Sequence, residues 1–215
     1  RMAGLASNRR LLGPDGKGGR SFAGHQLIPG PDGKSVEAPG SAWTGFGMGL
    51  GGGSTVYIRH LQSVLAYDST KPGLTGFRYA VPVDLPPVEG LYAGPAIVAD
   101  ATGRIYTTSR QGRLTRLTDI GREIRKDYDA AMRFKECIGL ALRPGPMLYV
   151  TDRGIDMSGE KTPARVCQLW DEGDGLYPVW ELADADIQGL RDVAVSPDDG
   201  ALYLLEDGDN FADYG

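Results

Sequence analysis

The sequence contains few of the residues on which several common protein classes depend. Its 215 residues include only two cysteines and two histidines, and no run approaches 18 consecutive apolar residues. Two cysteines are too few for a disulfide scaffold or a cysteine-rich zinc module, and the missing apolar run argues against a transmembrane helix. The 23 basic residues are outnumbered by 28 acidic ones, so the net charge favours neither nucleic acid nor an anionic membrane as a partner.

Glycine and proline, in contrast, are abundant. The chain has 32 glycines and 14 prolines, too many for a helical bundle but too few for collagen or a low-complexity chain. Both residues favour tight turns, because glycine tolerates positive φ and proline fixes φ. This composition indicates a chain that reverses direction often.

Four segments repeat one pattern, in which a short apolar strand and a tight turn precede a strand centred on tyrosine. The tyrosines are 49, 43 and 54 residues apart along the chain. The segments span residues 47–58, 96–107, 139–150 and 193–204, and their tyrosines are Tyr57, Tyr106, Tyr149 and Tyr203. A regular period of this length is typical of the blades of a β-propeller.

A third and a fourth apolar strand follow in the first three units. The third strands are expected at 63–68, 113–119 and 165–171, and the fourth at 76–81, 124–128 and 177–182. Residues 126–134 are the one candidate for a helix, as a single short insertion. We therefore predict an all-β fold, a β-propeller with four recognisable blades, with a β-sandwich as the alternative.

The number of blades depends on the N-terminal segment, residues 1–42, which precedes the blades at 43–215. Two expected strands, at 8–12 and 24–28, are each followed by the same Gly-Pro-Asp-Gly-Lys turn. If this segment completes the last blade, the ring closes and two exposed sheet edges disappear. If it does not, the chain is part of a larger propeller, and the sequence leaves both possibilities open.

The segment from Gly189 to Tyr203 resembles the repeats of NHL-type propellers, and residues 139–152 resemble the same repeat. It is also similar to blades of gluconolactonase and regucalcin-like lactonases and of soluble quinoprotein sugar dehydrogenases. The resemblance covers residues 45–210 as a repeat, and it supports the fold far more than any chemistry.

The catalytic motifs of these families are not matched. The resemblance to the lactonases implies a divalent metal held by Glu, Asn and Asp side chains, with Asn-Gly opening a strand. Here those positions read Ile138-Gly139 and Arg191-Asp192, and the only asparagines are Asn8 and Asn210. The dehydrogenases imply a histidine base, but neither His25 nor His60 lies in a matching motif. No cofactor is expected, although Ca²⁺ stays possible because carboxylates alternate in 171–175 and 206–210.

The loops that converge on one rim of a propeller are the expected ligand site. Counting from the repeat tyrosines and from the starts of the inner strands places eight charged residues there: His60, Arg110, Asp152, Arg153, Arg191, Asp192, Glu206 and Asp207. Such a set could bind a sugar or a peptide through charge-assisted hydrogen bonds. The alternative is that these residues form ion pairs between blades and satisfy loop backbone.

Three further features guide the prediction of function. The insertion at 155–163 is the most distinctive departure from the repeat and a candidate partner contact. Trp43, Trp170 and Trp180 either stack on sugars or pack between blades. Cys137 and Cys167 are expected to be buried free thiols, with a disulfide as the alternative.

We predict a non-catalytic binding or scaffolding module with a protein or glycan partner. Such a module could be one component of a larger extracellular or phage-type assembly. Its location is not determined by the sequence, and an extracellular or particle-associated protein is slightly favoured. The alternative is a sugar-directed enzyme of the quinoprotein dehydrogenase or lactonase type.

Overall fold

The structure is a computed structural model, and it describes most of the chain after residue 46. The described residues are 27–29, 35–37, 47–60, 63–71, 73–82, 96–108, 112–143, 145–154, 162–183, 187 and 189–206. Within them every regular element is a strand, apart from one 3-10 helix, η1 (Gly73–Gly76). No helix of the described part is long and apolar enough to cross a membrane.

Three four-stranded antiparallel sheets follow one another along the chain, and each is a simple meander. The first sheet contains β3 (Gly47–Leu50), β4 (Thr55–His60), β5 (Ser63–Asp68) and β6 (Phe77–Pro82). The second contains β7 (Ile97–Ala99), β8 (Arg104–Thr108), β9 (Leu114–Asp119) and β10 (Ile124–Asp129). The third contains β11 (Cys137–Arg143), β12 (Met147–Asp152), β13 (Arg165–Asp171) and β14 (Leu176–Ala183).

Two strand pairs complete the described elements. The fourth sheet has only β15 (Leu190–Val195) and β16 (Leu202–Glu206), which correspond to the first two strands of the other sheets. Near the N-terminus, β1 (Leu27–Pro29) and β2 (Ser35–Glu37) pair only with each other among the described strands. The prediction that residues 1–42 complete the last blade stays a prediction, and the expected strand at 8–12 lies outside the described residues.

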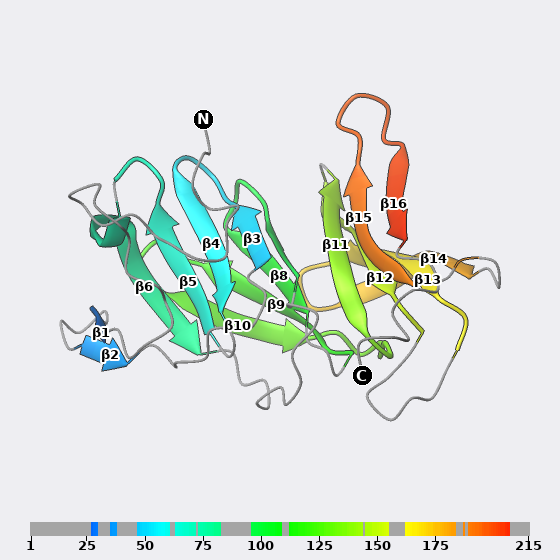
Figure 1. The fold of residues 1–215 in the computed structure, drawn as a ribbon, viewed down its shortest axis with the longest axis horizontal. Helices are drawn as coiled ribbons and strands as arrows, with labels where there is room; N and C mark the ends of the chain where they lie inside the picture. The colour runs from blue at the N-terminus through cyan, green and yellow to red at the C-terminus, as the bar shows by residue number, and fades with distance from the viewer. Residues whose placement is uncertain are drawn as a thin grey trace.

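The first strand of each sheet lies innermost. Strand β3 contacts β7, β7 contacts β11, and β11 contacts β15, so these strands form a row at the centre of the molecule. The sheets stand side by side around this row, as Figure 1 shows. This arrangement confirms the all-β, propeller-type part of the prediction. No closed ring is shown by the described residues, and the number of blades is not fixed by them.

The turn between the first two strands of a sheet shows how the sequence determines the repeat. In the second sheet, the Asp100 carboxylate accepts hydrogen bonds from the backbone N–H groups of Thr102 (2.8 Å) and Arg104 (3.1 Å). Gly103 then takes φ of +89°, where a Cβ would lie 2.8 Å from the carbonyl oxygen of Asp119. Only glycine adopts this conformation without strain, which accounts for part of the glycine excess.

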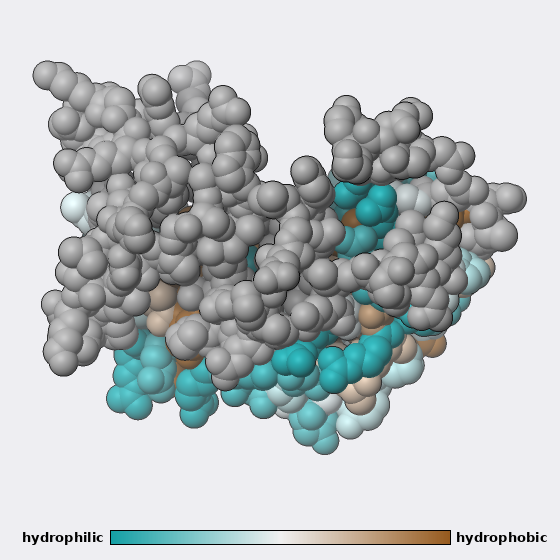
Figure 2. All heavy atoms as spheres, turned by 60° about the horizontal axis from the view of Figure 1, so that its bottom comes forward, coloured by the Kyte–Doolittle hydropathy of each residue, from teal (hydrophilic) through white to brown (hydrophobic). Residues whose placement is uncertain are grey.

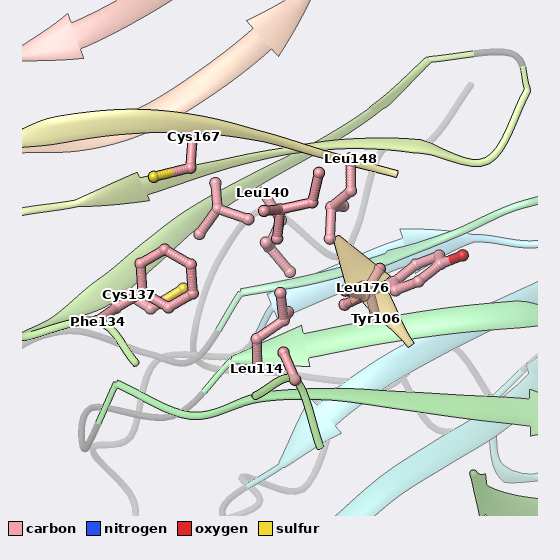
Figure 3. Close-up of a cluster of buried hydrophobic side chains, with 11 residues drawn as sticks. Tyr106, Leu114, Phe134, Cys137, Leu140, Leu148, Cys167 and Leu176 are labelled. Atoms are coloured by element: carbon pink, nitrogen blue, oxygen red, sulfur yellow. The ribbon is translucent and has the colours of Figure 1, made fainter. Parts of the chain in front are cut away.

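The core lies between consecutive sheets, not in one central cluster. One cluster joins the first and second sheets, and a larger one joins the second and third (Figure 3). Its buried members are Tyr106, Leu114, Ala130, Phe134, Cys137, Leu140, Leu148, Val150, Cys167, Leu169 and Leu176. Both cysteines are free thiols in this cluster, as predicted, and burial raises the pKa of Cys167 to about 12.

The expected helix at 126–134 is wrong. Residues 124–129 form β10, and residues 130–134 contain no helix. The strand is favoured because β10 pairs along β9, where Thr115 donates to the Asp129 carboxylate at 2.6 Å. Ladder hydrogen bonds and the burial of Ile124 therefore outweigh the local helix propensity of Ala130 and Ala131.

Candidate functional site

The candidate site is the end of the sheets where the innermost strands begin and the second strands end, here called the rim. The antiparallel pairing puts Cys137 opposite Asp152 and Leu190 opposite Glu206, so these residues share one end of their sheets. In Figure 1 the arrows of β4 and β16 both point to the lower edge. Figure 2 turns the molecule so that this edge comes forward, and the residues coloured along the lower side of that view are mostly hydrophilic.

Asp152, the last residue of β12, is buried and surrounded by donors. Its carboxylate accepts hydrogen bonds from the backbone N–H groups of Lys135, Glu136 and Gly154 at 3.0–3.1 Å, and from Nε of Arg165 at 3.1 Å. Only 1% of the residue is exposed. In this geometry Asp152 holds the loops around β12 together.

Arg153 also forms part of this loop framework. Its Nη1 lies 3.3 Å from Oε2 of Glu136, and both side chains are largely buried. Arg165 continues the network through Glu181 at 3.0 Å. Both contacts join residues of the third sheet and its connections, so these ion pairs are made within that sheet, whereas the alternative placed them between blades.

Asp192 differs from the residues that occupy its position in the other sheets. The corresponding residues at the start of the inner strand are Gly47, Ala96 and Gly139, which carry no side chain beyond a methyl group. Asp192 follows a β-bulge that leaves Arg191 as the extra residue of β15. Three small residues and one carboxylate thus face the same end of the inner strands, and bulges often redirect side chains at such ends.

The surroundings of Asp192 change its acidity. Burial raises the pKa of its carboxyl group, and the hydrogen bond from the Val193 backbone N–H to Oδ1 (2.9 Å) opposes this only in part. The strand β15 approaches β11 closely here, because a Cβ on Gly139 would lie 2.7 Å from the Cα of Asp192. The residue as a whole is nevertheless exposed, so a solute can reach a carboxylate that holds its proton more tightly than usual.

The structure describes some of the remaining predicted site residues and not others. Glu206 ends β16 and is exposed, opposite Leu190 at the start of β15. His60 ends β4 at the same rim, although its side chain lies outside the description. Arg110 and Asp207 lie outside the described residues. The structure therefore places His60, Asp152, Arg153, Asp192 and Glu206 at the same end of their sheets, but it gives no contact that joins them into one cluster.

Arg59 is a rim residue that sequence reasoning missed. It lies two residues beyond Tyr57, where the next two sheets have Thr108 and Thr151. Those threonines accept hydrogen bonds from the N–H groups at the starts of β7 and β11, both at 2.9 Å. Arg59 is only 1% exposed, and burial lowers its pKa to about 10. The signal was the replacement of threonine by arginine at one register position.

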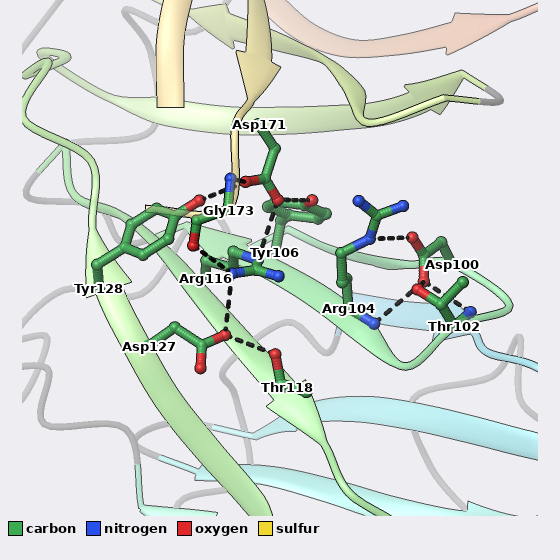
Figure 4. A network of polar contacts seen from close by, with 10 residues as sticks. All are labelled: Asp100, Thr102, Arg104, Tyr106, Arg116, Thr118, Asp127, Tyr128, Asp171 and Gly173. Atoms are coloured by element: carbon green, nitrogen blue, oxygen red, sulfur yellow. Dashed lines mark hydrogen bonds and ion pairs between the residues drawn. The ribbon is translucent and has the colours of Figure 1, made fainter. Parts of the chain in front are cut away.

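A second feature that the sequence did not reveal is a set of contacts between sheets. Tyr106 of β8 and Tyr128 of β10 both donate to the carboxylate of Asp171, which ends β13 of the next sheet (Figure 4). Nε of Arg116 lies 3.0 Å from the same carboxylate, and the Gly173 N–H donates at 2.7 Å. Burial would raise the pKa of Asp171, but these hydrogen bonds outweigh it and lower the pKa.

The same contact joins the first and second sheets. Tyr57 donates to Oδ2 of Asp119 at 2.6 Å, and Tyr79 donates to Oδ1 of the same residue. Each of the two aspartates thus receives two hydroxyl donors from the preceding sheet. The signal in the sequence was the aspartate that ends each third strand, at residues 68, 119 and 171.

Metal ligands are not gathered in the part of the chain that the structure describes. No group of three or more His, Cys, Asp and Glu side chains there could hold a metal ion. The positions at which the lactonase resemblance implies ligands carry Ile138, Gly139 and Arg191, and only Asp192 has a suitable oxygen. The described residues therefore do not fit the metal site of those lactonases.

Comparison with known proteins supports the fold. No family model matches the chain, so the NHL assignment is not confirmed, and no curated protein matches it. A provisionally named 6-phosphogluconolactonase from Bacteroides fragilis NCTC 9343 is similar in structure, with a TM-score of 0.51 and 13% sequence identity. The match covers 84% of this chain and 56% of that protein, so the chain spans little more than half of its length.

Two weaker similarities concern other enzymes. The glutaminyl cyclase of Myxococcus xanthus gives a TM-score of 0.43 at 11% identity, covering 79% of this chain and 70% of that one. A europium-containing methanol dehydrogenase gives 0.42 at 18% identity, covering 66% and 26%.

These findings correct the prediction of a non-catalytic binding or scaffolding module. The Bacteroides protein, whose fold is similar to that of the chain, is named as an enzyme, a 6-phosphogluconolactonase. The alternative, a sugar-directed enzyme, agrees better with them. At 13% identity the similarity to the Bacteroides protein supports a propeller-type fold and carries no conclusion about activity.

Proposed function

We propose that the chain is part of a propeller-type hydrolase that opens a sugar-derived lactone at the rim, with Asp192 as the general base. The observation that carries the proposal is that Asp192, an exposed residue with a partly buried carboxyl group, stands at a position where the other sheets have glycine or alanine. The fold shared with the Bacteroides protein, named as a 6-phosphogluconolactonase, supports the choice of substrate class.

The proposed reaction is the hydrolysis of a cyclic ester. Asp192 takes a proton from a water molecule, and the water oxygen attacks the carbonyl carbon of the lactone. The ring C–O bond then breaks, and Asp192 returns its proton to the leaving oxygen, which yields a hydroxy acid. A general base works best when its pKa approaches the working pH, and burial shifts the pKa of Asp192 in that direction.

A basic residue at the rim suits an anionic sugar. Arg191 directly precedes Asp192 and is partly exposed, whereas Arg59 at the same end of the first sheet is buried. A guanidinium can bind a phosphate or a carboxylate through two parallel hydrogen bonds. We therefore propose a phosphorylated or carboxylated sugar lactone as the substrate, in place of the glycan or protein partner expected from the sequence.

Lactone hydrolysis by the purified chain tests the proposal, measured as acid release at constant pH with gluconolactone and its 6-phosphate. Asp192→Asn should lower the rate by a factor of about 10²–10⁴, the usual contribution of a general base. Asp198→Asn is the matched control, because Asp198 lies exposed in the turn after β15. The wild-type rate should rise with pH as Asp192 loses its proton.

Parallel assays with Ca²⁺ and with a chelator separate this mechanism from a metal-dependent one. The proposed steps use only residues of the chain, so the chelator should leave the rate unchanged. Turnover that vanishes with the chelator, or that survives Asp192→Asn, would contradict the role of Asp192. A chain without lactonase activity under any of these conditions would contradict the proposed function itself.

A further inference from the structure

Each complete sheet carries a row of three residues at the same register. The central residue lies on the third strand, and its neighbours lie on the second and fourth strands. The rows are Tyr57–Ala66–Tyr79, Tyr106–Arg116–Tyr128 and Tyr149–Gln168–Trp180. The pairing of the fourth strand is irregular beside each row, so the three sheets share one local geometry there.

The first two rows meet the next sheet through one carboxylate. In each case the residue that ends the third strand of the next sheet, Asp119 or Asp171, accepts one hydrogen bond from a tyrosine hydroxyl on each oxygen. The donors are the hydroxyl groups at the two ends of the row. An ionised carboxylate has two acceptor oxygens and no donor, whereas an amide has one oxygen and an N–H donor group. Two hydroxyl donors held at this spacing therefore favour a carboxylate over an amide.

The third row offers the same chemistry with different side chains. Gln168 donates from Nε2 to the Tyr149 hydroxyl at 2.8 Å, so the tyrosine proton must point elsewhere. In the described part of the chain the acceptor for this proton is the sulfur of Met147 at 3.6 Å, which is a weak one. The indole of Trp180, whose ring meets that of Tyr149 edge to face at 6.4 Å, carries a donor and no acceptor.

The surface around this row is apolar and open. Four large side chains here are 37–47% exposed: Trp170, Tyr177, Trp180 and Leu182. Trp170 and Tyr177 remain exposed although they lie directly opposite each other on β13 and β14. In the first two sheets the equivalent surface is covered by residues of the third and fourth strands of the next sheet, among them Leu117 and Ile124 in one case and Leu169 and Leu176 in the other. Among the described residues the fourth sheet has only β15 and β16, so no third or fourth strand of that sheet covers the third sheet.

The N-terminal hairpin does not have the required residue. The last residue of a third strand pairs with the first residue of the fourth, as Asp119 does with Ile124 and Asp171 with Leu176. In the hairpin of β1 and β2, the position opposite Ser35 is Pro29, which has no carboxylate. A hairpin that repeats the carboxylate contact of the first two interfaces must therefore present an acidic residue that β1 lacks.

We propose that the exposed surface of the third sheet binds a β-hairpin that pairs with the edge of β16 and whose first strand ends in aspartate or glutamate. The carboxylate accepts hydrogen bonds from Tyr149 and Trp180, and the apolar side of the hairpin covers Trp170 and Leu182. This inference continues an interface that the first three sheets already form twice, and it does not depend on the proposed function.

A peptide spanning Arg165–Ala183 is a suitable probe, because it is a third and fourth strand that ends its first strand in Asp171. Fluorescence anisotropy of the labelled, reduced peptide measures its binding to the intact chain. The Asp171→Asn peptide should bind at least about tenfold more weakly, because a hydrogen bond to a charged group contributes about 1.5–3 kcal/mol. Tyr149→Phe in the protein should weaken the native peptide to a similar degree.

Tyr203→Phe is the matched control, because Tyr203 is exposed on β16 and does not belong to the third row. Fusing the hairpin to the C-terminus through a flexible linker supplies a high effective concentration, so a weak interaction still appears as a rise in thermal stability. The proposal is overturned if the Asp and Asn hairpins bind and stabilise equally, if Tyr149→Phe acts no more strongly than Tyr203→Phe, or if the fused hairpin gives no stabilisation.

Discussion

Replacing Tyr106 with phenylalanine removes a single hydroxyl from the contact between the second and third sheets. The tyrosine is 1% exposed, and its hydroxyl donates to the Asp171 carboxylate 65 positions along the chain. A hydrogen bond to a charged group contributes about 1.5–3 kcal/mol. Because Asp171 keeps Tyr128, Arg116 and the Gly173 N–H, we expect the lower part of this range, about 1.5–2 kcal/mol.

This loss of stability is measurable by thermal or urea unfolding. For a domain of this size, 1 kcal/mol shifts the Tm by about 2–4 °C, so Tyr106→Phe should lower the Tm by about 3–8 °C. A double-mutant cycle with Asp171→Asn should give a coupling energy of about 1–2 kcal/mol. The control cycle pairs Tyr106→Phe with Asp119→Asn, which lies in a different interface and should show almost no coupling. Equal coupling in both cycles would refute the assignment.

Other consequences follow from the same packing. Gly139→Ala would place a Cβ 2.7 Å from the Cα of Asp192, so the free energy of unfolding should fall by about 1–3 kcal/mol. The rate of lactone hydrolysis should fall as well. Leu148→Ala, at a fully buried position, should cost about 2–5 kcal/mol, whereas Leu182→Ala at an exposed position should cost far less. Burial and the bond to its aspartate raise the pKa of Tyr57 and its counterparts. The stability that they contribute is therefore complete below their ordinary pKa of about 10 and should decline above it, which urea unfolding at increasing pH would show.

The strands could be predicted from the sequence because each depends on local signals. Apolar runs of four to eight residues, bounded by glycine, proline and aspartate turns, located every strand of the three complete sheets to within about two residues. The short run at 126–134 misled the same reasoning, since alanine and methionine favour a helix when β9 is left out of account. Pairing with a neighbouring strand decided the outcome there.

The rim could be located from the sequence, but its contacts could not. Register arithmetic placed Asp152 and Asp192 at one end of their sheets, as the structure does. It could not tell that Asp152 is buried among four donors whereas Asp192 is exposed, because the donors come from residues 135, 136, 154 and 165. Such differences in burial arise from loops whose lengths vary from one sheet to the next.

The repeat tyrosines acquire a physical reason from the structure. They identified the repeat as a pattern, and the structure shows that Tyr57 and Tyr106 each tie one sheet to an aspartate of the next. At these two positions the tyrosine therefore reports contact between sheets, and its contribution to stability is enough to explain it. A residue that differs from its counterparts at the same register position has no such explanation. Two residues differ in this way: Asp192, where the three other sheets have glycine or alanine, and Trp180, where two sheets have tyrosine. For this reason we assign the proposed catalysis to Asp192, and the binding of an outside hairpin to the surface around Trp180.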